Sequence, residues 1–397
     1  MKMKQTLLAA AAISLLSTTA SAVDWGGYTR IGPGQKAGSG DGQRCFDGGA
    51  GGAGFGSQAP GHGGVGRLGN ECNTYGEFAL SQGMKAGGVD YKALLMTNFF
   101  NTGSDSSLAT SVNQLYVEGK GYDVAPNQTF WIGRRFYHRA DVHADDSFYV
   151  NMSGTGAGVD GIDLGFAQFS IAGFRTNDAA ATDNGGSRLN LDLENIKTNP
   201  GGALRLTADI TKFSGAGGKS GLGLSLQHNQ GGLFGADNTF WLQYAKGSAS
   251  MDMNFGNGTD DSDVKRWRIA DALAWTNGPL TAQTLLHYGK AKASDGEGGT
   301  LSTKTVSVMG RVAYAMTKNF KLQGELGTAS TKPDGGSSER ITKFTIAPTL
   351  TVGPNYYDRP ELRFYVSTFS MNDAYAAANG QTKKTRSAAG FQAEIWF

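Results

Sequence analysis

The chain has 397 residues, and its 36 basic and 34 acidic side chains leave a formal net charge of +2. So small a net charge gives no reason to expect a nucleic-acid partner. Glycine is about twice as frequent as usual, but the 10% of aromatic residues is too high for a disordered chain. After the N-terminus no segment approaches the roughly 20 apolar residues of a membrane-spanning helix, so a helical membrane protein is excluded.

The first 22 residues have the three parts of a secretory signal peptide. Lys2 and Lys4 form a basic start, residues 7–16 are apolar, and Ala20, Ser21 and Ala22 provide a small-residue cleavage site. The apolar run is too short for a membrane anchor. We expect cleavage after Ala22, which leaves 23–397 as one exported domain.

Two cysteines, Cys45 and Cys72, lie in the exported part. In an oxidising compartment such a pair predicts one disulfide that closes a surface loop. Metal binding is the disfavoured alternative, because two cysteines with no nearby ligand cluster do not make a metal site.

From the N-terminal region onward, the dominant pattern is an alternation of apolar and polar residues with a period of two. It is clearest in residues 204–211, 240–245, 306–314, 320–326 and 391–397. This period predicts strands with one apolar and one polar face. The connecting segments are rich in Gly, Asn, Asp and Ser, which is typical of turns, and no segment has a convincing helical period.

Two all-β architectures fit such strands: a soluble sandwich and a transmembrane barrel. A sandwich of this length would have several domains and some fully apolar core strands. A barrel explains both strand faces, since apolar residues face lipid, polar residues face a wet lumen, and no strand edge is left unpaired in the membrane. At about 20 residues per strand and connection, the chain predicts roughly 16 to 20 strands, enough to enclose an aqueous channel. The terminal Phe397 lies in the lipid-facing register, an ending typical of outer-membrane barrels.

Several motifs together resemble the maltoporins, the sugar-specific porins of Gram-negative outer membranes. These motifs are residues 23–30, 67–77, 131–143, 153–158 and 393–397. The resemblance implies an 18-stranded antiparallel transmembrane barrel in the outer membrane, assembled as a homotrimer. It also implies an inward-folded constriction loop, about residues 137–160, and passive diffusion of maltose and maltodextrins without any cofactor.

A sugar-selective channel needs flat aromatic rings for the apolar C–H faces of sugars, beside ionisable groups for their hydroxyl edges. The alternation places Tyr28, Tyr75 and Trp396 on the lumen face of their strands. The family's aromatic slide corresponds to Tyr28, Tyr75, Phe148, Phe234, Tyr357 and Trp396 in this sequence. The alternative is an interfacial aromatic girdle, to which many barrel Tyr and Trp residues belong.

The family's polar track corresponds to Arg30, Arg67, Glu77, Asn113, Arg139, Asp141 and Asp146. Charged groups make stronger hydrogen bonds to hydroxyls than neutral groups do, and mixed signs keep the narrow part polar without excluding neutral solutes. The alternative is a general porin constriction, in which opposed charges only shape ion flow.

The sequence also departs from the family pattern. Phe148 stands where the family has a constriction tyrosine, and Asn113 stands where it has an arginine. The second loop, about 101–111, is short and lacks a tryptophan, whereas residues 48–66 of the first loop are rich in glycine. These departures leave open a porin for another sugar, such as sucrose, or a less selective porin.

An enzyme or an adhesin is the alternative from another class. Asp141 and His143 lie near serines, as in a hydrolase, but no nucleophile elbow, zinc signature or phosphate-binding loop is present. We therefore expect no catalytic residues and no metal, and we expect oligosaccharides, outer-membrane lipid and further copies of the chain as partners.

Overall fold

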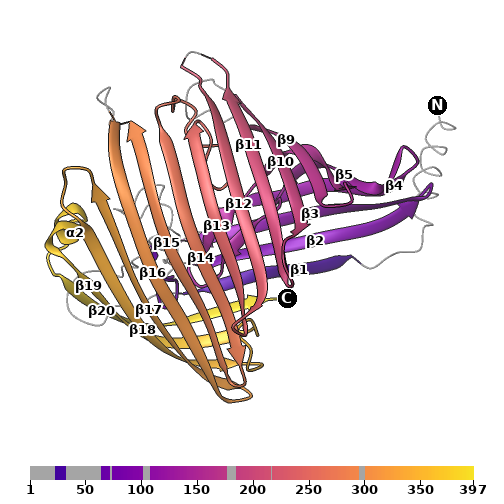
Figure 1. Ribbon diagram of the computed structural model, residues 1–397. Helices are drawn as coiled ribbons and strands as arrows, with labels where there is room; N and C mark the ends of the chain where they lie inside the picture. The colour runs from indigo at the N-terminus through magenta and orange to yellow at the C-terminus, as the bar shows by residue number, and fades with distance from the viewer. Residues whose placement is uncertain are drawn as a thin grey trace, which may run out of the picture.

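The computed structural model describes residues 23–32, 64–71, 74–101, 108–176, 185–215, 217–294 and 300–397. Within them, 18 antiparallel strands form one sheet that closes into a barrel where β1 pairs with β20 (Figure 1). The wall strands are β1 (Asp24–Ile31), β2 (Thr74–Ala86), β3 (Val89–Asn101), β4 (Ala109–Tyr122), β5 (Ala125–Arg135), β8 (Gly154–Asp163), β9 (Gln168–Thr176), β10 (Gly186–Lys197), β11 (Gly202–Phe213), β12 (Ser220–Leu233), β13 (Ala236–Gly247), β14 (Lys265–Asn277), β15 (Leu280–Ser294), β16 (Thr300–Thr317), β17 (Phe320–Pro333), β18 (Glu339–Thr351), β19 (Glu361–Met371) and β20 (Thr385–Trp396). The expected all-β, 18-stranded barrel is confirmed. The expected signal peptide 1–22 and both Cys45 and Cys72 lie outside the described residues.

The alternation seen in the sequence separates the two faces of the wall. On β18, for example, Lys343 and Thr345 are buried toward the lumen, whereas Phe344 and Ile346 are exposed on the outer face. Because the side-chain period of a strand is two, this pattern fixes the register of each strand against its neighbours.

Helix is scarce in the described part of the chain. The short helix α2 (Asp373–Ala378) follows β19, and the side chain of Asn372 caps it by accepting a hydrogen bond from the Tyr375 backbone. Among the described residues, no helix is long and apolar enough to cross a bilayer.

The two ends of the barrel differ in their connections. Two-residue turns join strands at one end, at 87–88, 123–124, 234–235, 278–279 and 318–319. The connections at the other end are mostly longer, as in outer-membrane barrels with short periplasmic turns and long external loops.

One of the long connections, residues 136–153 between β5 and β8, crosses the lumen; we call it the constriction loop. It contains the small hairpin of β6 (Ala140–Val142) and β7 (Ser147–Val150). Its Tyr149 ring stacks on Trp241 of β13, with centroids 4.5 Å apart. The expected range 137–160 is wrong at its C-terminal end, because residues 154–160 pair with β5 and β9 as wall strand β8.

Two further segments fold into the lumen: residues 64–71 of the first loop, the inner segment, and residues 352–360 between β18 and β19, the inward turn. Lys343 donates a hydrogen bond to the Leu68 carbonyl (2.9 Å), which fastens the inner segment to β18. Lys321 of β17 donates likewise to a carbonyl of the inward turn, that of Asn355 (2.9 Å).

The inward segments decide where the lumen stays open. Lumen-facing side chains of β16 to β19, such as Arg311 and Arg363, are almost completely buried beneath them. On β2 to β4, by contrast, the lumen-facing Glu77, Lys92 and Asn113 remain accessible. The open path therefore runs between the constriction loop and the wall around β1 to β5.

Candidate functional site

A row of aromatic rings follows the open side of the lumen, and we call it the aromatic stripe. Tyr28 of β1 is the direct register partner of Trp396 on β20. The Tyr28 and Tyr75 ring centroids are 6.2 Å apart, and those of Tyr357 and Trp396 are 6.5 Å apart. Phe100, at the loop end of β3, continues the row with its centroid 6.5 Å from that of Tyr75, in an edge-on arrangement. The stripe is Phe100, Tyr75, Tyr28, Trp396 and Tyr357.

The turn end of the stripe is held by charged and polar groups. The Arg359 guanidinium lies 4.3 Å from the Trp396 ring centroid, and Gln283 donates a hydrogen bond to the Tyr357 hydroxyl (3.2 Å). The imidazole of His143, from the constriction loop, lies 5.7 Å from Trp396 and 5.6 Å from Tyr357. Burial and then the nearby Arg67 lower the pKa of His143 to about 3, so this imidazole is neutral at physiological pH.

Polar groups flank the loop end of the stripe. The Tyr75 hydroxyl donates a hydrogen bond to Glu77, and the Asn113 amide donates to Tyr75 (3.2 Å) and to Glu77 (3.3 Å). The three side chains come from β2 and β4, and they place a carboxylate, an amide and a phenol beside the open path.

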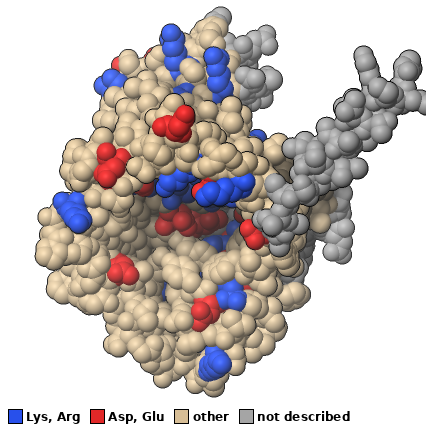
Figure 2. Space-filling view, turned by 90° about the vertical axis from the view of Figure 1, so that its right-hand side faces the viewer, with Lys and Arg blue, Asp and Glu red and all other residues tan. Residues whose placement is uncertain are grey.

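The constriction loop supplies the opposite side of the path. Asp146 forms an ion pair with Arg30 of β1 at 3.5 Å, which ties the loop to the wall. Desolvation inside the barrel and the neighbouring Asp146 raise the pKa of Asp141, although the Asp141 side chain remains accessible. Figure 2 shows a hollow in the molecule in which acidic and basic side chains gather.

Arg139 and Phe148 lie together on this loop. The Arg139 guanidinium carbon is 4.3 Å from the ring centroid of Phe148 and also 4.3 Å from that of Phe136. The expected slide residue Phe148 therefore stands in the constriction, but Arg139 covers part of its ring.

Arg67, expected in the polar track, is buried instead, with only 3% of its surface exposed. Its guanidinium donates to the Tyr28 hydroxyl (2.8 Å) and to Glu71 (2.8 Å), and it lies 3.1 Å from Glu394. The expectation of a direct contact with solute is wrong, because the inner segment packs Arg67 beneath the stripe. There it positions the phenol of Tyr28.

The expectation that Phe234 belongs to the aromatic slide is wrong as well. Phe234 occupies the two-residue turn between β12 and β13, is 97% exposed, and has a φ of 52°. The glycines on either side, Gly232 and Gly235, also have positive φ. This is turn geometry, and it places the ring at the rim of the barrel rather than in the open path.

Two aromatic residues of the site escaped the sequence analysis: Phe100 and Phe136. The alternation could have found Phe100, because it shares the lumen face of β3 with Asn98, while the adjacent Phe99 stacks on Phe78 outside. Phe136 gave no periodic signal, because it lies in the irregular part of the constriction loop.

Residues that could hold a metal ion gather once in the described part of the chain, at His138, Asp192 and Glu194. The guanidinium of Arg205 binds Asp192 at 2.8 Å and Glu194 at 3.3 Å. Arg205 therefore supplies the positive charge that a cation would bring to these carboxylates.

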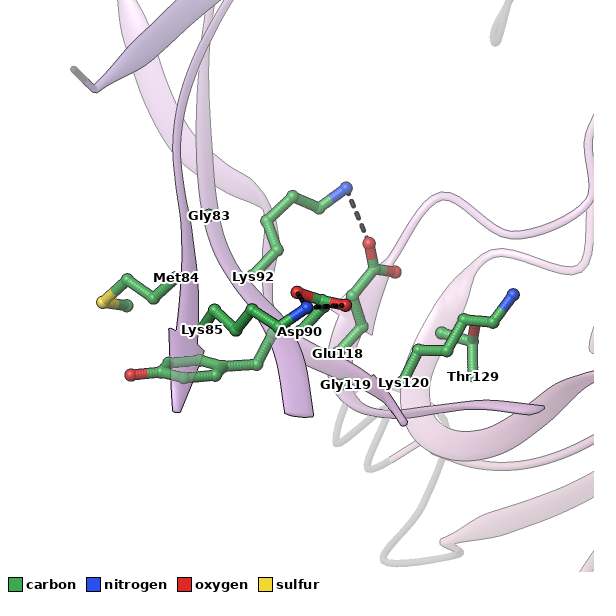
Figure 3. Close-up of a pocket in the computed structure, with 10 residues that line it drawn as sticks. Gly83, Met84, Lys85, Asp90, Lys92, Glu118, Gly119, Lys120 and Thr129 are labelled. Carbon is green, nitrogen blue, oxygen red and sulfur yellow. Dashed lines mark hydrogen bonds and ion pairs between the residues drawn. The ribbon is translucent and has the colours of Figure 1, made fainter. Parts of the chain in front are cut away.

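A polar recess of about 590 Å³ lies at the turn end of β2 to β5 (Figure 3). Two ion pairs cross it, Lys92 to Glu118 at 2.6 Å and Lys85 to Asp90 at 3.1 Å. Lys120 also lines the recess, so three basic side chains stand there beside two acidic ones.

A closed barrel with an apolar outer face and a charged, accessible lumen defines an outer-membrane porin. The comparisons agree: residues 23–397 match the family model described as LamB porin, and the chain belongs to this family. It is accordingly a porin, a β-barrel of the Gram-negative outer membrane.

A relative named maltoporin, from Hahella chejuensis (strain KCTC 2396), is 30% identical over 413 aligned residues, covering 98% of this chain and 96% of the relative. Among solved structures, the chain is similar in fold to OccAB1 of Acinetobacter baumannii, with a TM-score of 0.52, 10% identity, and 94% and 96% of the two chains covered. It is also similar to the outer membrane protein opdK of Pseudomonas aeruginosa, with a TM-score of 0.50, 11% identity, and 82% and 93% covered.

Proposed function

We propose that the protein is a sugar-selective passive channel whose substrates are maltose and maltodextrins. The observation that carries the proposal is the aromatic stripe, in which five rings from four neighbouring strands and the inward turn follow one side of the open path. The rings would bind the C–H faces of sugar units, while Arg30, Glu77, Arg139 and Asp141 would exchange hydrogen bonds with hydroxyls. The maltoporin relative supports this substrate class.

A second candidate is a porin for another sugar, such as sucrose, or a less selective porin. The observations that favour it are the missing hydroxyl at Phe148 and the missing charge at Asn113. Both changes remove a polar group beside the open path and leave the rings of the aromatic stripe unchanged.

The test is titration of single channels in planar bilayers with maltose, maltohexaose and sucrose. A transport site must release its sugar, so we expect block of the ion current with a dissociation constant near 1 mM, which corresponds to about −4 kcal/mol. Stronger block by maltohexaose than by sucrose supports the maltodextrin assignment, and the reverse order supports the second candidate. The sugar proposal fails if none of these sugars blocks the channel at tens of millimolar.

We also propose that the barrel assembles as a homotrimer in the outer membrane. Trp25, Phe78 and Phe397 form a ring cluster on the outer face of β1, β2 and the C-terminus, and the Trp25 and Phe397 ring centroids lie 4.9 Å apart in a tilted arrangement. Aromatic residues of this kind pack well against lipid or against a second barrel. Native mass spectrometry in mild detergent should show three copies, and a monomer under those conditions would contradict the assembly.

Export with removal of residues 1–22 and a disulfide between Cys45 and Cys72 complete the proposal. The intact mass of the purified protein should start at Val23. Alkylation without reduction should leave both thiols unlabelled, and full labelling of both would rule out the disulfide.

A further inference from the structure

Arg139 is the one arginine of the constriction loop that extends into the open path, and two phenylalanines of the same loop contact it. Its guanidinium carbon lies over both the Phe136 and the Phe148 ring, at 4.3 Å from each centroid. Phe136 precedes the β6–β7 hairpin. Phe148 belongs to it and is the register partner of Asp141. The hairpin therefore brings two apolar faces to one flexible cation.

These contacts leave the hydrogen-bonding edge of Arg139 available. A guanidinium that stacks on a ring uses its flat face, while its five N–H donors point outward in the plane. Within the described part of the chain, no side chain or backbone group accepts a hydrogen bond from the Arg139 guanidinium at bonding distance. Arg30 and Arg67, in contrast, already donate to Glu71.

We propose that Phe136 and Phe148 act as a clamp that holds the Arg139 guanidinium in the open path, with Phe136 as a positioning residue that the solute does not need to touch. This inference rests on the proposed function for its sugar readout. A free arginine side chain has many rotamers. Without the clamp, Arg139 would leave the path, and both its positive charge and the donors that meet a passing hydroxyl would be lost there.

Phe136 carries the test because Phe148 is itself a candidate contact of the sugar. The variants are Phe136→Leu, the conservative Phe136→Tyr, Arg139→Ala and the double variant Phe136→Leu with Arg139→Ala. Phe391→Leu is the matched control, since Phe391 lies on the outer face of β20 and is 47% exposed. If Phe136→Leu does not yield a folded barrel, Phe148→Leu takes its place for the reversal potential alone, the readout that needs no sugar.

Two readouts are measured for each variant: block of the ion current by maltohexaose, and the reversal potential in a KCl gradient. We expect Phe136→Leu to raise the blocking constant about threefold to tenfold, the range of one cation–π contact, and to shift selectivity toward cations, in the direction of Arg139→Ala. Phe136→Tyr retains a ring, so it should stay near wild type in both readouts. In the Arg139→Ala background, Phe136→Leu should add no further change.

The double variant distinguishes the clamp from a direct contact between Phe136 and the sugar. Equal effects of Phe136→Leu with and without Arg139 would overturn the clamp, as would wild-type behaviour of Phe136→Leu in both readouts. If no sugar blocks the wild-type channel, the proposed function fails, but the reversal potentials still test the clamp because they need no sugar.

Discussion

Phe99 and Phe100 are neighbours in the chain, but the pleat of β3 sends their rings to opposite faces of the barrel. Phe99 stacks on Phe78 outside, with centroids 5.5 Å apart, whereas Phe100 meets Tyr75 in the lumen. The second loop carries no tryptophan, and Phe100 lies where β3 enters that loop. Of the five rings of the stripe, Phe100 is therefore the first that a sugar from the loop side would meet.

We expect Phe100→Ala to weaken sugar block roughly threefold to tenfold, because one aromatic contact contributes about 0.5–1.5 kcal/mol. The measurement is the blocking constant of maltohexaose in planar bilayers. Phe99→Ala is the matched control, one residue away on the lipid face, and it should leave block unchanged. Equal blocking constants for the two variants would remove Phe100 from the stripe.

Asp141 gives the constriction a dependence on pH. Its pKa is raised by desolvation and by Asp146, so it takes up a proton at pH values where an ordinary aspartate is still charged. As the pH falls through this range, the path loses one negative charge, and cation selectivity should decline.

Reversal potentials in a KCl gradient between neutral and weakly acidic pH measure this change. Asp141→Asn should abolish it, and an unchanged pH profile in that variant would assign the titration to another group. His143 should not contribute, since it is neutral over the whole range.

At the scale of elements, the constriction loop is held at its far side by the barrel wall. Besides the stack of Tyr149 on Trp241, the Ala144 backbone donates to Gln283 of β15 (2.7 Å), and Arg311 of β16 donates to the Ala144 carbonyl (3.1 Å). The loop thus spans the lumen from β5 to the opposite side, and its position sets the width of the path.

Tyr149→Ala should release part of this attachment, because removing a buried aromatic ring costs about 3–5 kcal/mol of packing free energy. The wall strands pair without Tyr149, so the barrel should still fold, while open-channel conductance and current noise should rise. Single-channel recording checks this. Tyr314→Ala, on the outer face of β16 and half exposed, should conduct as the wild type does. A conductance equal to wild type in Tyr149→Ala would show that the remaining contacts fix the loop.

The elements differ in how far the sequence predicts them. Local alternation suffices for the wall, and it places Tyr28, Tyr75 and Trp396 on the lumen face, because each residue's side follows from its position in its own strand. Phe234 was misplaced because a turn has no such alternation, although its flanking glycines carried a turn signal. The inner segment and the inward turn were not predictable in this way, since their partners are distant in sequence: Leu68 bonds to a lysine 275 residues away.

The same distance explains the misplacement of Arg67. The resemblance placed it in the polar track, and only the fold of the inner segment shows that Glu71 and Glu394 enclose it. A residue's role in a channel therefore depends on what covers it, and alternation along a strand contains no information on that.

On the scale of the whole molecule, charged side chains between the wall and the inward segments connect the two ends of the chain. Glu394 of β20 accepts a hydrogen bond from the Tyr28 hydroxyl (2.9 Å) and from Arg359 of the inward turn (2.8 Å), and it also binds Arg363 of β19. Arg67 of the inner segment lies 3.1 Å away. One buried carboxylate thus joins β1, β19, β20 and both inward segments where the barrel closes.

Glu394→Gln should therefore affect stability and function together. Removing one partner of a buried ion cluster leaves arginines uncompensated, which costs about 3–5 kcal/mol, so the unfolding temperature in detergent, followed by circular dichroism, should fall clearly. The same change loosens the Tyr28 phenol, so sugar block should weaken as well.

The control is Asp90→Asn, which breaks the exposed pair with Lys85 at the barrel rim. Because exposed pairs contribute about 0–1 kcal/mol, this variant should unfold near the wild-type temperature. If Glu394→Gln is no less stable than Asp90→Asn, the inward segments are held by packing and backbone hydrogen bonds, and the charge cluster serves to line up the stripe rather than to close the barrel.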